Sequence, residues 1–182
     1  MAGEAKREAI LSAAQELLLK HGLRGTSMEA IARQAQIAKP TLYAYFPDKI
    51  AIFQTLVDAV IAEWRDNFVG ALGGKGDIVQ RVGAALTAKN KGAMRLISAS
   101  PHAAEFYDAH DRVSAEQFRR FDAEVAAALE TALSQAGVTR ARLVTQMLLA
   151  SSFGIGHRAT NPAELGPALR LLAERLIRPE LP

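Results

Sequence analysis

The chain has 182 residues, of which 49% are hydrophobic and 23% charged, and it carries a formal net charge of +3 and no cysteine. This length and composition exclude wholesale disorder and allow one large domain or two small domains with a buried core. The absence of cysteine excludes disulfides, cysteine-ligated zinc sites and thiol nucleophiles, so we expect a protein of the reducing cytoplasm.

Apolar residues recur at helical spacing in almost every long segment, and alanine, the best helix former, is abundant. We therefore predict an all-α protein. The first helix is expected from about Glu4 to Lys20, with Gly22 as a left-handed stop. Residues 1–14 mix acids and bases and do not resemble a secretory signal. The most apolar run, residues 143–156, is shorter than the roughly 20 residues of a membrane span.

Two short helices are predicted next. The second helix begins at Thr26 or Ser27, either of which can cap it with a hydroxyl group, and it ends near Gln34. The third helix opens at Lys39, where the proline that follows suits a first turn whose N–H groups have no helical partner. It stops at Pro47 after barely two turns.

A long fourth helix is predicted to start at Asp48, which can cap it, and to be long enough to link two domains. Residues 70–76 have the glycine density of a flexible loop. Further helices are expected at about residues 77–90, 91–99, 101–108, 111–136, 139–158 and 162–177.

Residues 27–46 have the pattern of a helix-turn-helix, whose second helix enters the major groove of DNA. The positive charge is concentrated nearby, because residues 20–49 hold five bases and two acids while residues 50–182 are close to neutral. A solvated surface that is basic for no functional reason would explain this charge as well. Leu42 and Phe46 are expected to be buried. The residues predicted to contact phosphates and base edges are Thr26, Ser27, Lys39, Pro40, Thr41, Tyr43, Tyr45 and Lys49.

Residues 25–32 read Gly-Thr-Ser-Met-Glu-Ala-Ile-Ala, and residues 35–49 read Ala-Gln-Ile-Ala-Lys-Pro-Thr-Leu-Tyr-Ala-Tyr-Phe-Pro-Asp-Lys. This order resembles the TetR family of bacterial transcriptional regulators. The resemblance implies that Thr-Leu-Tyr-Ala-Tyr-Phe is the recognition helix and that Lys49 begins the helix leading into a ligand-binding domain. Two positions depart from the family pattern, Gln36 where glycine is usual and Ala38 where serine is usual. Each departure could cost about 1 kcal/mol of local stability.

The same resemblance implies two domains. The first, residues 1–48, is a three-helix DNA-binding helix-turn-helix domain, and the second, residues 49–182, is a larger helical domain for ligand binding and dimerisation. We predict a ligand-responsive repressor that binds a palindromic double-stranded DNA operator as a homodimer, since half-sites about 34 Å apart require a symmetric pair. The apolar helices at 139–158 and 162–177 would form the dimer interface, or else bury against their own domain.

Large aromatic and methionine side chains are concentrated in the helices that would surround a central cavity. Such a lining suits a small hydrophobic or aromatic effector, whose binding would release the operator. The same residue types at helical spacing also form ordinary core. The residues predicted to bind the effector are Trp64, Phe68, Met94, Phe118, Phe121, Met147 and Phe153.

One cluster suggests a metal or acid–base site: His102, Glu105, Asp108, His110 and Asp111. On a continuous helix its two histidines would lie about 12 Å apart, too far to chelate one ion, so a solvated polar face is favoured. No serine has a convincing base nearby, and we predict no catalytic residue, metal or cofactor, and no enzyme. The alternative function is a helical small-molecule binding protein with a vestigial DNA-binding head.

Overall fold

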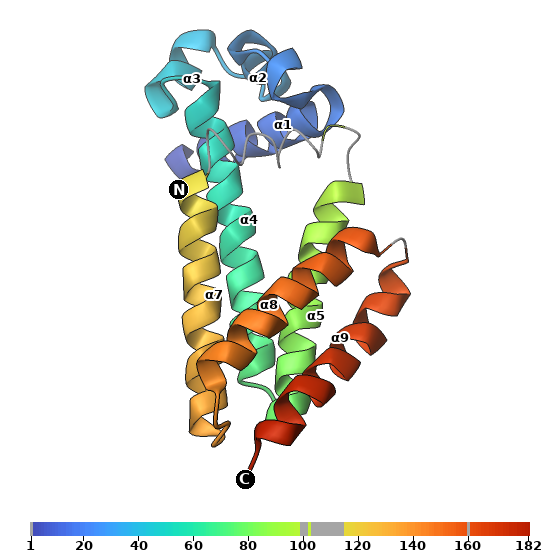
Figure 1. Cartoon of the computed structure of the whole chain (residues 1–182). Coiled ribbons are helices and arrows are strands. Elements are labelled where there is room, and N and C mark those ends of the chain that lie inside the picture. The colour runs from blue at the N-terminus through green and yellow to red at the C-terminus, as the bar shows by residue number, and fades with distance from the viewer. Residues whose placement is uncertain (1, 99–101, 103–114, 160) are drawn as a thin grey trace. The chain divides into compact units, whose positions relative to one another are not determined.

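The computed structural model describes residues 2–98, 102, 115–159 and 161–182, and every regular element in this part of the chain is helical (Figure 1). The predicted all-α fold is thus confirmed. No helix in the described ranges combines the length and apolar character needed to cross a bilayer. The elements are α1 (Ala2–Gly25), α2 (Met28–Gln34), α3 (Lys39–Tyr45), α4 (Lys49–Leu72), α5 (Ile78–Ser98), α7 (Ala115–Gln135), α8 (Ala141–Arg158), α9 (Pro162–Ile177) and the 3₁₀ helix η2 (Arg178–Glu180).

The chain divides into two compact units. Unit 1 comprises residues 1–60 and 96–118, and unit 2 comprises residues 61–95 and 119–182. Helices α4, α5 and α7 therefore contribute residues to both units. This division by packing differs from the predicted functional division after residue 48, which stays a prediction.

Each unit has its own apolar core, built from the inward faces of its helices. Burying a large apolar side chain contributes roughly 1.5–3 kcal/mol, so these residues supply the main stabilising term in each unit. The largest fully buried side chains of unit 1 are Ile10, Leu18, Ile31, Leu42, Ile52 and Phe53. Those of unit 2 are Phe68, Leu86, Leu129, Leu133, Leu148 and Leu165.

The predicted starts of the second, third and fourth helices are confirmed. The Ser27 side chain accepts a hydrogen bond from the backbone N–H of Ala30 at 3.2 Å and so caps α2. Helix α3 begins at Lys39. The Asp48 carboxylate accepts from the N–H of Ala51 at 2.8 Å and caps α4. The caps of α2 and α4 could be predicted from the sequence because each acts within a single helical turn. The start of α3 could be predicted because Pro40 suits a first helical turn.

One predicted helix end was confirmed and one was wrong. Gly22 interrupts the first helix with a left-handed φ of 69° and a non-helical ψ of 175°, as expected, although a further helical stretch within α1 continues to Gly25. The loop predicted at residues 70–76 is shorter, because α4 continues to Leu72. At Gly70 the loss of helix propensity, about 1 kcal/mol for a glycine, is too little to end a helix that is anchored by buried side chains such as Phe68 and Leu72.

The predicted break between helices 77–90 and 91–99 was also wrong, because α5 runs through it without interruption. The Asn90 amide donates to the Leu86 carbonyl at 2.9 Å, one turn back along the same helix, and leaves the backbone helical. In a turn, by contrast, an asparagine side chain replaces a backbone hydrogen bond of the helix. Asn90 does not do so, and the helix therefore continues past it.

The remaining predicted helices lie towards the end of the chain. Helices 139–158 and 162–177 are confirmed as α8 and α9, although α8 begins at Ala141. The predicted helix 111–136 is described only from Ala115 onward, as α7. The predicted helix 101–108 lies outside the described residues, apart from His102. The closing 3₁₀ helix η2 was not predicted.

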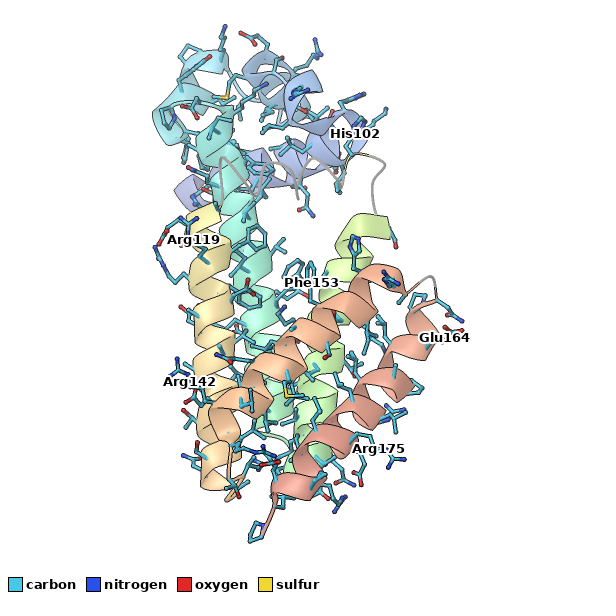
Figure 2. The ribbon with its side chains drawn as sticks, viewed as in Figure 1. His102, Arg119, Arg142, Phe153, Glu164 and Arg175 are labelled. Atoms are coloured by element: carbon cyan, nitrogen blue, oxygen red, sulfur yellow. The ribbon has the colours of Figure 1, made fainter. Side chains whose placement is uncertain are left out.

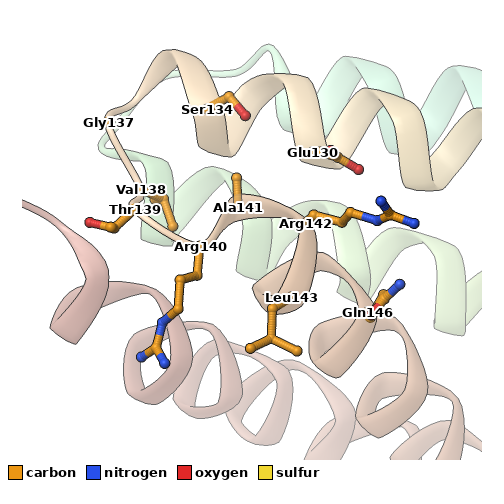
Figure 3. A pocket seen from close by; sticks show the side chains of 10 residues that line it. All are labelled: Glu130, Ser134, Gly137, Val138, Thr139, Arg140, Ala141, Arg142, Leu143 and Gln146. Atoms are coloured by element: carbon orange, nitrogen blue, oxygen red, sulfur yellow. The ribbon is translucent and has the colours of Figure 1, made fainter.

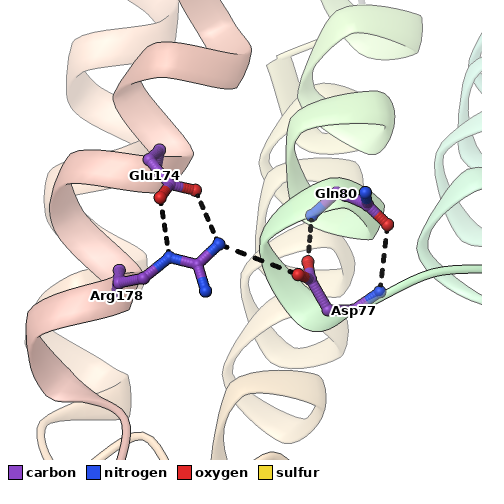
Figure 4. Close-up of polar contacts among 4 residues, drawn as sticks. All are labelled: Asp77, Gln80, Glu174 and Arg178. Atoms are coloured by element: carbon purple, nitrogen blue, oxygen red, sulfur yellow. Dashed lines mark hydrogen bonds and ion pairs between the residues drawn. The ribbon is translucent and has the colours of Figure 1, made fainter.

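Polar contacts tie the end of the chain to the start of α5 within unit 2 (Figure 4). The Arg178 guanidinium donates to both carboxylate oxygens of Glu174, at 2.6 and 3.1 Å, and lies 3.8 Å from the Asp77 carboxylate. Asp77 also accepts from the N–H of Gln80 at 2.9 Å, while the Gln80 side chain accepts from the N–H of Asp77 at 3.2 Å. This reciprocal pair is a capping box, and it satisfies two N–H groups at the start of α5.

Candidate nucleic-acid interface

The turn between α2 and α3 forms without the glycine that usually occupies it. Gln36 has a φ of 55°, the one positive φ outside glycine in the described part of the chain. The next N–H, that of Ile37, donates to the Ala32 carbonyl at 3.0 Å and closes the turn. A side chain in this conformation costs about 1 kcal/mol relative to glycine. Ala38 provides no side-chain cap for α3, so the bond that a serine would supply is missing.

Helix α3 has one buried side and one exposed side. Leu42 is fully buried and Phe46, just beyond the helix, is 5% exposed, as predicted. The Arg7 guanidinium of α1 lies 5.5 Å from the centre of the Phe46 ring and covers it. Tyr43 faces outward and is 44% exposed. The predicted DNA-contacting residues of α3 are all exposed or half-buried: Lys39, Pro40, Thr41, Tyr43 and Tyr45.

Lys39 contacts two neighbouring side chains on this surface. Its ammonium group hydrogen-bonds the carboxylate of Glu29, on α2, and lies 5.9 Å from the centre of the Tyr43 ring. The hydrogen bond raises the pKa of Lys39 above its ordinary value and lowers the pKa of Glu29 below its own. Both groups are therefore charged near neutral pH. Glu29 was not among the predicted site residues, because a contact across ten residues and a turn leaves no local signal in the sequence.

Thr26 and Lys49 close the end of α1. The Lys49 ammonium donates to the carbonyls of Leu23 and Thr26, at 2.8 and 2.9 Å. The Thr26 hydroxyl donates to the Gly22 carbonyl at 2.8 Å, and the residue is only 2% exposed. Terminal carbonyls of a helix lack intrahelical donors, which explains this arrangement. DNA contact by these two residues stays a prediction, as it does for Ser27, which is exposed.

The N-terminal third of the chain matches known regulators in sequence. A family model for bacterial regulatory proteins of the tetR family matches residues 10–56, which include all of α2 and α3. The chain is 41% identical over 59 residues to the HTH-type transcriptional regulator EthR of Mycobacterium tuberculosis (strain ATCC 25618 / H37Rv). It is 38% identical over 60 residues to the HTH-type transcriptional regulator RutR of Escherichia coli (strain K12). Over residues 10–56 the chain is therefore similar to bacterial regulatory proteins of the tetR family.

The alignments to EthR and RutR span only part of each chain. The alignments cover 32% and 33% of this chain but only 27% and 28% of EthR and RutR. A transcriptional regulator of the TetR/AcrR family from Thermobifida fusca YX-ER1 shares the fold, with a TM-score of 0.73 and 19% identity over 92% of this chain and 95% of that one. Identity at this level shows the fold alone. The predicted helix-turn-helix head followed by a larger helical domain is thus confirmed.

Three of the residues predicted to bind an effector lie in the core of unit 2. Trp64, Phe68 and Phe121 are buried, and the rings of Trp64 and Phe121 meet at 6.3 Å between centres and 56° between planes. Met94 and Phe118 are half-buried.

The other two predicted effector residues, Met147 and Phe153, lie on α8 and are 45% and 63% exposed. Figure 2 shows Phe153 on this helix. The Phe153 ring stacks on the ring of His157, one turn further along, with 6.1 Å between centres. Some of the residues predicted to bind an effector are therefore buried in the core of unit 2, while Met147 and Phe153 lie on the surface. No ligand tests either placement, and the effector assignments stay predictions.

A surface depression of about 610 Å³ lies where α7 passes into α8, and none of the predicted effector residues lines it (Figure 3). Arg140 and Arg142 give it a cationic side, and Glu130 supplies the opposite charge. Arg140 is bound to the Glu180 carboxylate, with one contact of 2.9 Å, so it is occupied within the chain. The depression thus has both polar and apolar side chains in its lining, whereas a mainly apolar lining was predicted for the effector site.

The predicted histidine and carboxylate cluster falls on residues outside the described ranges, apart from His102. Within the described ranges no three His, Asp or Glu side chains come together in a way that could hold a metal ion.

A substitution at Lys49 tests whether its ammonium stabilises the end of α1. Lys49→Met keeps the length of the side chain but removes the charged donor from two carbonyls, and should lower the free energy of unfolding by about 1.5 kcal/mol. The measurement is a urea titration followed by circular dichroism. Lys20→Met, at an exposed lysine of α1, is the matched control and should leave the midpoint unchanged. Equal midpoints for the two variants would contradict the role of Lys49 in closing α1.

Proposed function

We propose that this chain is a transcriptional regulator that binds operator DNA through the exposed side of α3. The observation that carries the proposal is Tyr43, an aromatic residue left 44% exposed on a short helix within the segment matched by the family model. A phenol reaches phosphate at low entropic cost, and an ammonium can donate to base edges or phosphates. Lys39 lies beside it with its ammonium near the Tyr43 ring. The protein would act in the cytoplasm, where the DNA is.

Replacing Lys39 and Tyr43 with alanine should abolish retention of DNA in a gel-shift assay. The duplex is the one that the wild-type chain selects from a random-sequence library, since the operator is unknown. Lys75→Ala, at an exposed lysine of the loop after α4, removes the same charge and should leave retention unchanged. Wild-type affinity should also fall steeply with salt, because phosphate contacts release counterions.

Unchanged helical circular dichroism must accompany the loss in the double variant, so that unfolding does not explain it. If the wild-type chain selects no duplex at all, the alternative of a small-molecule binding protein with a vestigial head is favoured. If the double variant retains the selected duplex, α3 is not the helix that reads it.

The chain is proposed to act as a homodimer through α8 and α9, which pack against each other within unit 2. Val144 and Leu148 bury one side of α8, while Leu143 and Met147, four residues apart, share an exposed side. Leu171 of α9 is also exposed. Large apolar side chains concentrated on one helical pair are typical of a surface that a partner covers. A second copy is the partner that a palindromic operator requires.

This proposal gives Met147 and Phe153 a different role from the one predicted. Both are exposed on α8, the helix that would meet a second copy, and a dimer would bury them without placing them in a ligand cavity. We therefore assign them to the dimer surface.

Replacing both Leu143 and Leu171 with aspartate should convert a dimer into a monomer, because the interface would have to bury unpaired charges. Sedimentation velocity at micromolar concentration measures the change. Val69→Asp, at a similarly exposed apolar residue of α4, is the control and should remain dimeric. A wild-type chain that sediments as a monomer would refute the dimer, and a dimeric double variant would place the interface elsewhere.

We propose that a small hydrophobic or aromatic effector binds beside Trp64 and Phe121 and releases the operator. The supporting observation is the pairing of these two rings in unit 2, where they would offer an apolar, shape-selective surface. Binding at the effector site and binding of DNA must then weaken each other by the same factor.

The fluorescence of Trp64 reports on this site, because it is the one tryptophan in the sequence. A panel of hydrophobic and aromatic compounds should include one that changes Trp64 emission and lowers DNA retention over the same concentration range. Phe121→Leu should weaken that compound about tenfold, or roughly 1.4 kcal/mol, whereas Phe153→Leu should have no effect. Equal weakening by both variants, or release of DNA without a change in emission, would argue against this site.

A further inference from the structure

The ion pair between Glu29 and Lys39 lies on the surface that is proposed to meet DNA. Glu29 belongs to the first turn of α2 and Lys39 is the first residue of α3, so the pair spans the turn of the helix-turn-helix. The two side chains are 58% and 51% exposed, which leaves the pair open to a large polyanion. No other acid of residues 20–49 lies on α2 or α3, since Asp48 precedes α4.

The pair restricts what Lys39 can offer to DNA. An ammonium has three N–H donors, so Lys39 can keep its bond to Glu29 and still donate to an acceptor in the groove. A phosphate carries a full negative charge, and it would be repelled by the carboxylate beside the ammonium. The acceptors on base edges, such as O6 and N7 of guanine, carry no net charge and meet much less repulsion.

The position of the ammonium is also restricted. Lys39 is held from one side by Glu29 and lies 5.9 Å from the centre of the Tyr43 ring. A lysine otherwise samples many rotamers, and fixing it before binding lowers the entropic cost of a directed contact. A contact with phosphate depends on the charge of the ammonium more than on its orientation, so it gains little when the Lys39 side chain is held in place.

We propose that Glu29 is a specificity-determining residue, whose carboxylate directs Lys39 towards base edges and weakens binding to DNA that lacks the operator sequence. The inference rests on the proposed DNA-binding function. Discrimination between two partners often requires a group that repels the wrong one. Here the Glu29 carboxylate would repel the phosphates of DNA that lacks the operator sequence.

Glu29→Gln tests the inference, because it keeps the size of the side chain and removes its charge. Binding to a random-sequence duplex should become about fivefold tighter, while binding to the duplex selected by the wild-type chain changes less than twofold. The slope of log K against log salt for the random duplex should steepen by about 0.9, the value for one added phosphate contact.

Two further variants identify the cause. Glu16→Gln removes a carboxylate from α1 of the same unit, where Glu16 accepts from the Gln34 side chain at 2.9 Å, and so reproduces the change in net charge at another place. It should leave the ratio of the two affinities at the wild-type value. In a chain that already carries Lys39→Met, Glu29→Gln should no longer steepen the salt slope, because the ammonium on which it acts is absent.

The outcomes separate the inference from the function on which it rests. A wild-type chain that retains no selected duplex refutes the proposed function and the inference together. Wild-type retention with an unchanged affinity ratio in Glu29→Gln overturns the inference alone. It is also overturned if Glu16→Gln matches Glu29→Gln, or if Glu29→Gln weakens binding to both duplexes, since Glu29 would then act through net charge or through the fold.

Discussion

Helix α3 has seven residues, and an isolated helix of that length does not form in water. Its geometry depends on burial of Leu42 and Phe46 against the rest of unit 1. The local sequence does little else to hold it, since Ala38 gives no cap and Gln36 occupies a left-handed turn position. Everything proposed for the exposed side of α3 follows from this one packing contact, because burying Leu42 turns Tyr43 outward.

The same packing decides how much positive charge unit 1 offers to a polyanion. Two of the five bases in residues 20–49 are engaged within the chain, Lys49 by backbone carbonyls and Lys39 by Glu29. Lys20, Arg24 and Arg33 remain exposed. The net charge of a segment therefore overstates the cations available at its surface. It also conceals an acid, Glu29, that lies beside α3.

In unit 2 the division between core and surface is decided by how the helices meet. Trp64 and Phe121 lie far apart in the sequence and come together only because α4 and α7 pack in the same unit. Met147 and Phe153 belong to the same class of residue but lie on the exposed part of α8. Residue type and spacing could not distinguish the buried residues from the exposed ones. The predicted effector site therefore contained both kinds.

The sequence by itself determined the helical fold, the resemblance of residues 10–56 to tetR-family proteins, the helix caps at Ser27 and Asp48, and the helix start at Lys39. Each of these depends on periodicity, on an ordered run of residues, or on a cap that acts within one turn. Only the tertiary structure decided that Lys49 closes α1, that Glu29 binds Lys39 and that Met147 remains exposed. The physical reason is range: the two polar contacts join residues at least ten positions apart, and exposure depends on which neighbouring helices cover a face.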